Sequence, residues 1–293
     1  MNTTKGELVQ FKASDGLVLT GFLSRAKKPN GTVIIHVHGF GGNFASWSRL
    51  FQAYGRALKQ GFSLFSINTR GAGLKTWFRS DRKSFTIGSS NEVFEDSVKD
   101  ISGAIAAAKR LGYARVILSG HSTGCQKVTY YQSLKQDQSV KDLILLAPAD
   151  DYNLHKKEFG DRFEPTVSLA KAMVTLGKGN QTMPEWTGVS NMSAARFTSV
   201  ASSGMAEASL FDYESEKLQL YSKVRCPVLA VFGRREQYRT KPVGKYIEKL
   251  KSDGYLWFTG KVISGADHGF TGRAPALSKV IGKWLEGREG HQS

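Results

Sequence analysis

The sequence predicts an α/β fold with a doubly wound, mostly parallel, eight-stranded sheet and an inserted helical cap. Three observations predict it. Short apolar runs alternate with amphipathic stretches, most of the runs lack polar alternation, and this rhythm breaks between residues 151 and 222. Strands that are apolar throughout are buried on both faces, as in parallel sheets joined by helical crossovers. We therefore expect a core made of residues 1–150 and 223–293, with the cap at 151–222.

Eight stretches predict the strands of this sheet. The first two alternate between apolar and polar residues around Ser14-Asp15-Gly16, which is typical of a hairpin. The others are largely apolar and are closely followed by Gly or Pro, as in buried strands. In chain order the predicted strands lie at residues 8–12, 17–23, 32–37, 63–68, 116–119, 142–146, 228–232 and 258–263.

Amphipathic stretches between the strands predict the helices. The first has apolar side chains at helical spacing and ends at Gly61. These side chains belong to Trp47, Leu50, Phe51, Tyr54 and Leu58. Further core helices are expected around residues 94–108, 123–134, 246–250 and 277–285. Within the cap, a helix is expected after Pro165, with apolar positions between residues 167 and 176.

Composition limits the classes of function. Hydrophobic residues make up 40% of the chain, enough for a large packed interior, and 41 Lys and Arg against 25 Asp and Glu give a net charge of +16. Such a charge attracts nucleic acid, acidic lipid or an anionic substrate, or it keeps a protein soluble. No basic helix, zinc pattern or RNA-binding aromatic signature accompanies it, so we expect no nucleic-acid partner.

Targeting signals are also missing from the pattern. No stretch reaches the roughly 18 apolar residues of a membrane span, and MNTTKGELVQ lacks the apolar region of a secretory signal. We therefore expect a cytoplasmic protein with no membrane span. Cys125 and Cys226 both lie beside predicted core strands, where buried free thiols are expected.

A serine turn carries the clearest chemical signal. Gly120-His121-Ser122-Thr123-Gly124 matches the G-x-S-x-G pattern and lies between a predicted strand and a predicted helix. This is the context of a nucleophile elbow, in which a sharp turn projects the serine hydroxyl above the sheet edge. Glycines flank the serine because the tight turn leaves no room for larger side chains. Ser122 is therefore the predicted nucleophile.

A serine needs a general base, and the base should come from a later loop at the same sheet edge. His268 follows the last predicted strand, in Gly265-Ala266-Asp267-His268. The other histidines fit this position less well. They lie in a strand, in the strand-end loop, in the elbow, at the start of the cap and in the tail: His36, His38, His121, His155 and His291.

The third member should be a carboxylate that holds the imidazole in the correct tautomer. In this arrangement the chain order is serine, acid, histidine, and Glu236 follows the strand that ends at Phe232. Asp150, after the preceding strand, is the alternative acid. A structural alternative for Glu236 is an ion pair with the neighbouring arginines.

Attack on a carbonyl creates an oxyanion that needs two preorganised donors. The backbone N–H groups of Thr123 and of Phe40, in His38-Gly39-Phe40-Gly41-Gly42, are expected to supply them. His38 is expected to brace this loop. In the cap, Met183, Trp186 and Phe211 are candidates for an apolar substrate pocket, with ordinary packing as the alternative.

The ordered set of His-Gly turn, serine elbow, acid loop and terminal histidine resembles the α/β-hydrolase superfamily of esterases, lipases and thioesterases, over nearly the whole chain. The segment Gly120-His121-Ser122-Thr123-Gly124-Cys125-Gln126 is also similar to that of fungal siderophore-esterase-like proteins. One departure is Glu236, where Asp is usual in the superfamily. Relatives that cleave haloalkanes or epoxides have aspartate at the elbow, so the serine here disfavours those reactions.

These observations lead to a hypothesis of ester hydrolysis through an acyl-enzyme on Ser122, with no metal and no organic cofactor. Alternatives are a thioesterase or a carbon–carbon bond hydrolase with the same triad, a catalytically silent ligand receptor on the same fold, or a basic interaction module. The substrate is expected to be a small ester. The substrate is expected to be anionic if basic loop residues surround the entrance to the active site. Those residues are Arg70, Lys75, Arg79, Arg82, Lys83, Arg234, Arg235 and Arg239.

Overall fold

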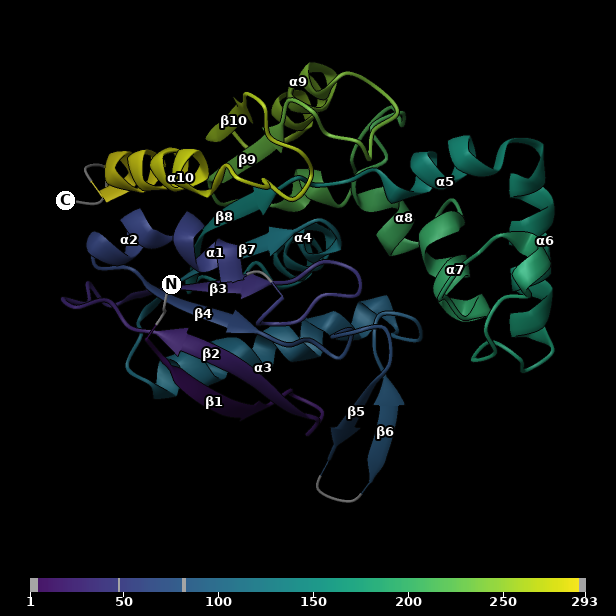
Figure 1. Cartoon of the computed structure of the whole chain (residues 1–293), viewed down its shortest axis with the longest axis horizontal. Helices are drawn as coiled ribbons and strands as arrows, with labels where there is room; N and C mark the ends of the chain where they lie inside the picture. Colours follow the sequence, from purple (N-terminus) through teal and green to yellow (C-terminus); the bar gives the residue numbers. More distant parts are fainter. Residues whose placement is uncertain (1–4, 47, 81–82, 290–293) are drawn as a thin grey trace.

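A single twisted sheet organises the core of the protein (Figure 1). The structure is a computed structural model that describes residues 5–46, 48–80 and 83–289. Within these residues the strand order is β10-β9-β8-β7-β3-β4-β2-β5-β6, and β1 pairs with β2. The strands are β1 (Glu7–Lys12), β2 (Val18–Ser24), β3 (Thr32–Val37), β4 (Ser63–Ile67), β5 (Thr76–Arg79), β6 (Ser84–Ile87), β7 (Arg115–His121), β8 (Val140–Leu146), β9 (Val228–Gly233) and β10 (Phe258–Ile263).

The predicted α/β sheet is confirmed. The six strands β3, β4, β7, β8, β9 and β10 pair in parallel, and their carboxyl ends therefore meet at one edge. β1, β2, β5 and β6 pair antiparallel. The described part of the sheet has ten strands rather than eight, because β5 and β6 extend it where the sequence predicts a loop. These two strands are short, and most of their side chains are exposed, so they form no apolar run.

Helices cover both faces of the sheet (Figure 1). The helices of the described residues, including those of the segment between β8 and β9, are α1 (Ser48–Ala53), α2 (Gly55–Lys59), α3 (Ser97–Arg110), α4 (Thr123–Lys135), α5 (Asp151–Phe159), α6 (Phe163–Thr175), α7 (Ala194–Ala201), α8 (Ala206–Leu210), α9 (Val243–Asp253) and α10 (Ala274–Glu289). The helix predicted around residues 47–58 is two short helices, α1 and α2, which meet at Tyr54. Trp47, Arg82, His291 and the side chain of Leu50 lie outside the described residues.

Alternate side chains of the central strands enter separate hydrophobic clusters on the two faces. In β3, Val33, Ile35 and Val37 belong to one cluster, and Ile34 belongs to the other. Each fully buried aliphatic side chain of this kind stabilises the fold by about 1.5–3 kcal/mol. Burial on both faces explains why the strand sequence lacks polar alternation.

The chain between β8 and β9 forms a helical segment, residues 151–222, that contains α5 to α8. Within its described residues the only β-type pairing is an isolated bridge between Thr182 and Ser193. The segment has a hydrophobic cluster of its own, which includes Phe159, Phe163 and Phe197. Figure 1 shows α5, α6 and α7 together beyond the carboxyl ends of the parallel strands. Its role as a cap stays a prediction.

Two smaller expectations from the sequence also have structural counterparts. Cys125 and Cys226 are buried free thiols. In the part of the chain that the structure describes, no helix is both long and apolar enough to cross a membrane.

Candidate active site

Ser122 lies in a strained turn between β7 and α4. Its backbone angles are φ 53° and ψ −127°, a region that is costly for residues other than glycine by about 1–3 kcal/mol. Two hydrogen bonds hold the turn. The Ser122 N–H donates to the Leu146 carbonyl oxygen at 3.0 Å, and the Cys125 N–H donates to the Ser122 carbonyl oxygen at 2.8 Å. The turn therefore has the geometry of a nucleophile elbow.

The glycines on either side of Ser122 are required by close backbone contacts. A Cβ on Gly120 would lie 2.3 Å from the carbonyl carbon of Gly124, and a Cβ on Gly124 would lie 2.2 Å from the carbonyl oxygen of Val37. Real Cβ atoms do not approach backbone this closely. Gly120 therefore lets the end of β7 pack against the start of α4, and Gly124 lets α4 pack against the end of β3.

His268 and Glu236 meet at the same edge of the sheet. Glu236 follows β9, His268 follows β10, and His268 Nδ1 lies 2.9 Å from Glu236 Oε1. A carboxylate only accepts hydrogen bonds, so Nδ1 carries the proton and Nε2 is left as an acceptor. The Tyr238 N–H donates to the same Glu236 oxygen at 3.0 Å. Both partners are buried, which keeps the pair out of bulk water.

Asp150, the alternative acid, has other partners. It precedes α5 and caps that helix, because its Oδ1 accepts the Asn153 N–H at 3.0 Å. Its Oδ2 accepts the Tyr213 N–H at 3.2 Å. The structure therefore brings Glu236, and not Asp150, to His268.

His121 supports the His268 loop from the elbow side, a role that the sequence did not indicate. Its Nε2 lies 2.9 Å from the His268 carbonyl oxygen, so Nε2 carries a proton and donates it. Burial, and then the nearby His268, hold the pKa of His121 well below its usual value. A neutral imidazole in the elbow thus fixes the backbone of the residue that would act as base.

A cavity of about 370 Å³ opens beside Ser122. Ser122 and His268 both line it, as do Phe40 and Thr123, the residues predicted to donate backbone N–H groups to an oxyanion. Gly39 brings this loop close to the elbow, since a Cβ on it would lie 2.9 Å from Ser122 Cβ. The remaining lining residues are Gly42, His121, Ala149, Asp151, Leu154, His155, Glu158, Met192, Arg196, Val200 and Tyr238.

The three predicted pocket residues lie elsewhere, and this prediction needs correction. Trp186 is 75% exposed, Met183 is buried among the side chains of the helical segment, and Phe211 is buried in the main core. None of the three lines the cavity beside Ser122. Hydrophobicity alone did not distinguish packing from lining, because both need apolar side chains.

The basic residues predicted around the entrance do not line the cavity, within the part of the chain that the structure describes. Arg70 is buried and pairs with Asp15, Asp96 and Asp100, so the prediction is wrong for this residue. Arg82 lies outside the described residues. The others are exposed and do not line the cavity: Lys75, Arg79, Lys83, Arg234, Arg235 and Arg239. Of the described Lys and Arg residues, the one that lines it is Arg196, from the helical segment.

His38 braces the loop that carries Phe40, as predicted. It is 1% exposed, its Nδ1 lies 2.9 Å from the Gly39 carbonyl oxygen, and its Nε2 accepts the Thr69 N–H at 3.3 Å. Burial, and then the charge of Lys127, lower the pKa of His38 to about 4. His38 is therefore neutral at physiological pH.

This shift predicts a pH dependence of stability. Between pH 6.5 and about 4 the unfolded chain binds a proton at residue 38 and the native protein does not. Stability is therefore lost as the pH falls through this window, by up to about 3 kcal/mol for this group. We expect the His38→Gln protein, which has no titrating group at residue 38, to lose less stability over the same pH window. Denaturant unfolding of both proteins at the two ends of the window measures this, and parallel losses would contradict it.

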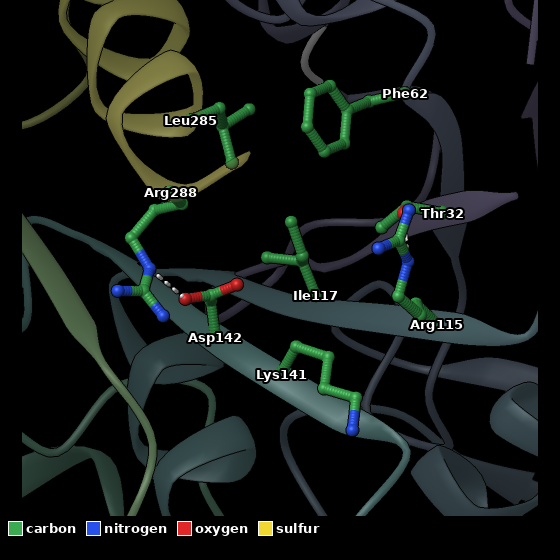
Figure 2. Close-up of a pocket in the computed structure, with 8 residues that line it drawn as sticks. All are labelled: Thr32, Phe62, Arg115, Ile117, Lys141, Asp142, Leu285 and Arg288. Carbon is green, nitrogen blue, oxygen red and sulfur yellow. Dashed lines mark hydrogen bonds and ion pairs between the residues drawn. The ribbon is translucent and has the colours of Figure 1, made fainter. Parts of the chain in front are cut away.

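A second, smaller cavity lies at the opposite edge of the sheet (Figure 2). It has a volume of about 20 Å³ and is lined at the amino ends of β3, β7 and β8. Arg288 Nε donates to Asp142 Oδ1 at 2.9 Å beside it, and apolar side chains such as Leu285 cover it. It has room for about one water molecule, so we assign it no substrate. Among the described residues, no cluster of His, Cys, Asp and Glu is arranged to hold a metal ion.

Solved structures of similar fold include several esterases and hydrolases. The chain aligns with Est1E from Butyrivibrio proteoclasticus with bound ferulic acid at 16% identity and a TM-score of 0.68, covering 96% of this chain and 100% of that one. It aligns with the Pyrococcus furiosus esterase Pf2001 at 15% identity and a TM-score of 0.58, covering 97% of this chain and 92% of the esterase. It aligns with an α/β serine hydrolase homologue from Coxiella burnetii at 16% identity and a TM-score of 0.57, covering 97% of this chain and 99% of that one. These likenesses confirm the α/β-hydrolase fold.

Comparison with curated proteins gives no significant match, and the narrower likeness to siderophore-esterase-like proteins stays a prediction. The family described as "Protein of unknown function (DUF1749)" matches residues 80–282. Because this match covers more than half of the chain, the protein belongs to that family, and it has the α/β-hydrolase fold.

Proposed function

We propose that this protein is a serine hydrolase that cleaves a carboxylic ester through an acyl-enzyme on Ser122. The observation that supports this most is the contact of 2.9 Å between His268 Nδ1 and Glu236 Oε1, in a loop whose histidine lines the same cavity as Ser122. The contact orients the imidazole so that Nε2 accepts a proton. The strained turn at Ser122 supplies the nucleophile.

In the first half of the proposed reaction, Ser122 Oγ attacks the ester carbonyl carbon while its proton passes to His268 Nε2. The carbonyl oxygen gains the negative charge, and the Phe40 and Thr123 N–H groups stabilise it. The carbon–oxygen bond to the alcohol then breaks. His268 returns its proton to the departing oxygen, which leaves an ester of Ser122.

In the second half, water attacks the acyl-enzyme. His268 takes one proton from the water, the oxyanion forms again at the same two N–H groups, and the bond to Ser122 Oγ breaks as the proton returns to that oxygen. The net reaction consumes one water and yields an acid and an alcohol. Glu236 stabilises the imidazolium in both halves through the proton on Nδ1.

We also propose that the helical segment, residues 151–222, acts as a cap that shapes the substrate cavity. Three of its apolar side chains line the cavity: Leu154, Met192 and Val200. They would exclude water from the acyl-enzyme, which strengthens electrostatic interactions at the reacting atoms.

A fluorophosphonate probe tests the proposal directly, because it bonds to an activated serine without needing the natural substrate. We expect wild-type protein to be labelled at Ser122 and Ser122→Ala not to be labelled, with mass spectrometry as the measurement. Ser119, which is buried in β7 three residues before Ser122, is a control, since Ser119→Ala leaves Ser122 in place and should retain labelling. No labelling of folded wild-type protein would favour a catalytically silent receptor.

If labelling occurs, paired oxoester, thioester and β-diketone substrates distinguish the reactions open to the same triad. We expect the oxoester to be hydrolysed with the highest kcat/KM. If the thioester or the diketone has a higher kcat/KM, that compound replaces the ester as the proposed substrate class. Ser122 remains the proposed nucleophile.

A further inference from the structure

One wall of the cavity beside Ser122 is polar, and it belongs to the helical segment. Helix α5 contributes Asp151, Leu154, His155 and Glu158, which lie at i, i+3, i+4 and i+7 and therefore share one face of the helix. Arg196, from α7, lines the same cavity. The proposed mechanism uses none of the four polar side chains among them.

Asp151 has one carboxylate oxygen engaged within the protein. Its Oδ2 accepts the Gln126 side-chain N–H at 2.8 Å. Burial raises the pKa of Asp151 to about 6, with the charge of Glu207 as the next cause. At pH 8 the group is therefore an ionised hydrogen-bond acceptor on the cavity wall.

His155 holds a buried nitrogen without a protein partner. Within the described residues its Nδ1 makes no hydrogen bond, and Glu158 Oε2 lies 3.9 Å from it. Burial, and then Arg196, lower the pKa of His155 to about 4, so the ring is neutral. Buried polar atoms are nearly always satisfied, and an unpaired nitrogen in a residue that lines a cavity indicates a missing hydrogen-bond partner.

Arg196 is already paired within the protein. Both of its terminal nitrogens contact the Glu207 carboxylate, with Nη2 to Oε1 at 2.6 Å, and its Nε donates to the Ser89 carbonyl oxygen at 3.1 Å. The guanidinium thus has no free fork for a substrate carboxylate. Its charge still disfavours a substrate cation close to it.

The wall selects by charge as well as by hydrogen bonding. A substrate carboxylate would face Asp151 and Glu158, and a substrate ammonium would face Arg196. An uncharged group that can both donate and accept a hydrogen bond avoids repulsion by the carboxylates and by the guanidinium. A hydroxyl group has this chemistry, since it can donate to Asp151 and accept from or donate to the neutral ring of His155.

We propose that Asp151 and His155 form a subsite that binds a hydroxyl group of the substrate, away from the ester that Ser122 attacks. The subsite rests on the proposed function for its place in a reaction, and it makes the substrate a hydroxylated ester rather than an anionic one. Asp151 and His155 are specificity-determining residues in this proposal, since neither contacts the reacting atoms.

Matched ester series at pH 8 test the subsite. One series varies the acyl chain and the other varies the alcohol, and each compares a terminal methyl, hydroxyl, carboxylate and ammonium group over a range of chain lengths. In one of the two series, at the best chain length, we expect the wild-type kcat/KM of the hydroxyl ester to exceed that of the methyl ester about tenfold. This factor corresponds to one added hydrogen bond. The two charged esters should be poorer than the hydroxyl ester.

Two variants assign the preference to the subsite. In Asp151→Ala the ratio of hydroxyl to methyl ester should fall to about one. Asp161→Asn removes a carboxylate that is exposed and does not line the cavity, so this control should keep the wild-type ratio. The proposal is overturned if wild-type protein shows no hydroxyl preference at any length, or if Asp151→Ala keeps it.

A binding measurement separates this proposal from the proposed function. Ser122→Ala protein is titrated calorimetrically with the hydroxyl and methyl esters, which it would not turn over. Tighter binding of the hydroxyl ester, lost in the Ser122→Ala/Asp151→Ala double variant, supports the subsite even if wild-type protein hydrolyses no ester. Equal binding of the two esters overturns the subsite and leaves the assignment of Ser122 untouched.

Discussion

Replacing Ser122 with alanine is expected to reduce kcat for ester hydrolysis about a million-fold. The hydroxyl is the atom that forms the acyl-enzyme in the proposed mechanism, and loss of a triad nucleophile has an effect of this order in serine hydrolases. The backbone of the turn should be unchanged, because alanine has the same steric restriction as serine at φ 53°. Steady-state kinetics with an activated ester, on protein with wild-type circular dichroism, measures the loss.

A second variant separates chemistry from folding. Ser122→Gly should be as inactive as Ser122→Ala, but more stable than it by about 1 kcal/mol, because glycine adopts this backbone conformation without strain. Denaturant unfolding measures the difference. If Ser122→Ala keeps a hundredth of wild-type kcat or more, Ser122 is not the nucleophile.

Replacing Glu236 with glutamine is expected to lower kcat about ten-thousand-fold. The carboxylate accepts the proton on His268 Nδ1, whereas a glutamine amide can donate to that nitrogen and so favour the wrong tautomer. Substrate KM should change little, since Glu236 does not line the cavity. The measurement is kcat and KM for one ester in both proteins.

Asp150→Asn is the matched control for this prediction. Asp150 caps α5 and accepts the Tyr213 N–H, so its amide variant should lose about 1–3 kcal/mol of stability and keep kcat within a few-fold of wild type. The opposite pattern, with Asp150→Asn inactive and Glu236→Gln active, would transfer the acid role to Asp150.

The periodicity of the chain was sufficient for the fold. The apolar runs at β3, β7 and β8 read clearly because both faces of these strands are buried, and all eight predicted strands are present. The pattern failed at β5 and β6, where Phe78 is the one buried side chain. It also placed one helix where α1 and α2 meet at Tyr54, because helical spacing continues across the junction.

The cavity was the part that sequence reasoning missed. Met183 and Phe211 have the composition of pocket residues but fill hydrophobic clusters, and Trp186 is exposed to solvent. Three polar side chains that do line the cavity, Asp151, His155 and Glu158, share one face of α5. That spacing is visible in the sequence, but nothing in it indicates which face of α5 is turned toward Ser122.

Local pattern was enough to place Ser122, Glu236 and His268 at the carboxyl ends of parallel strands, because strand burial and tight turns are dictated by neighbouring residues. Folding was needed to assign partners. Residues far apart in the chain decide which carboxylate contacts His268 and which cations form ion pairs. They also decide which helix lines the cavity. Such contacts arise from packing in three dimensions, and no short window of sequence encodes them.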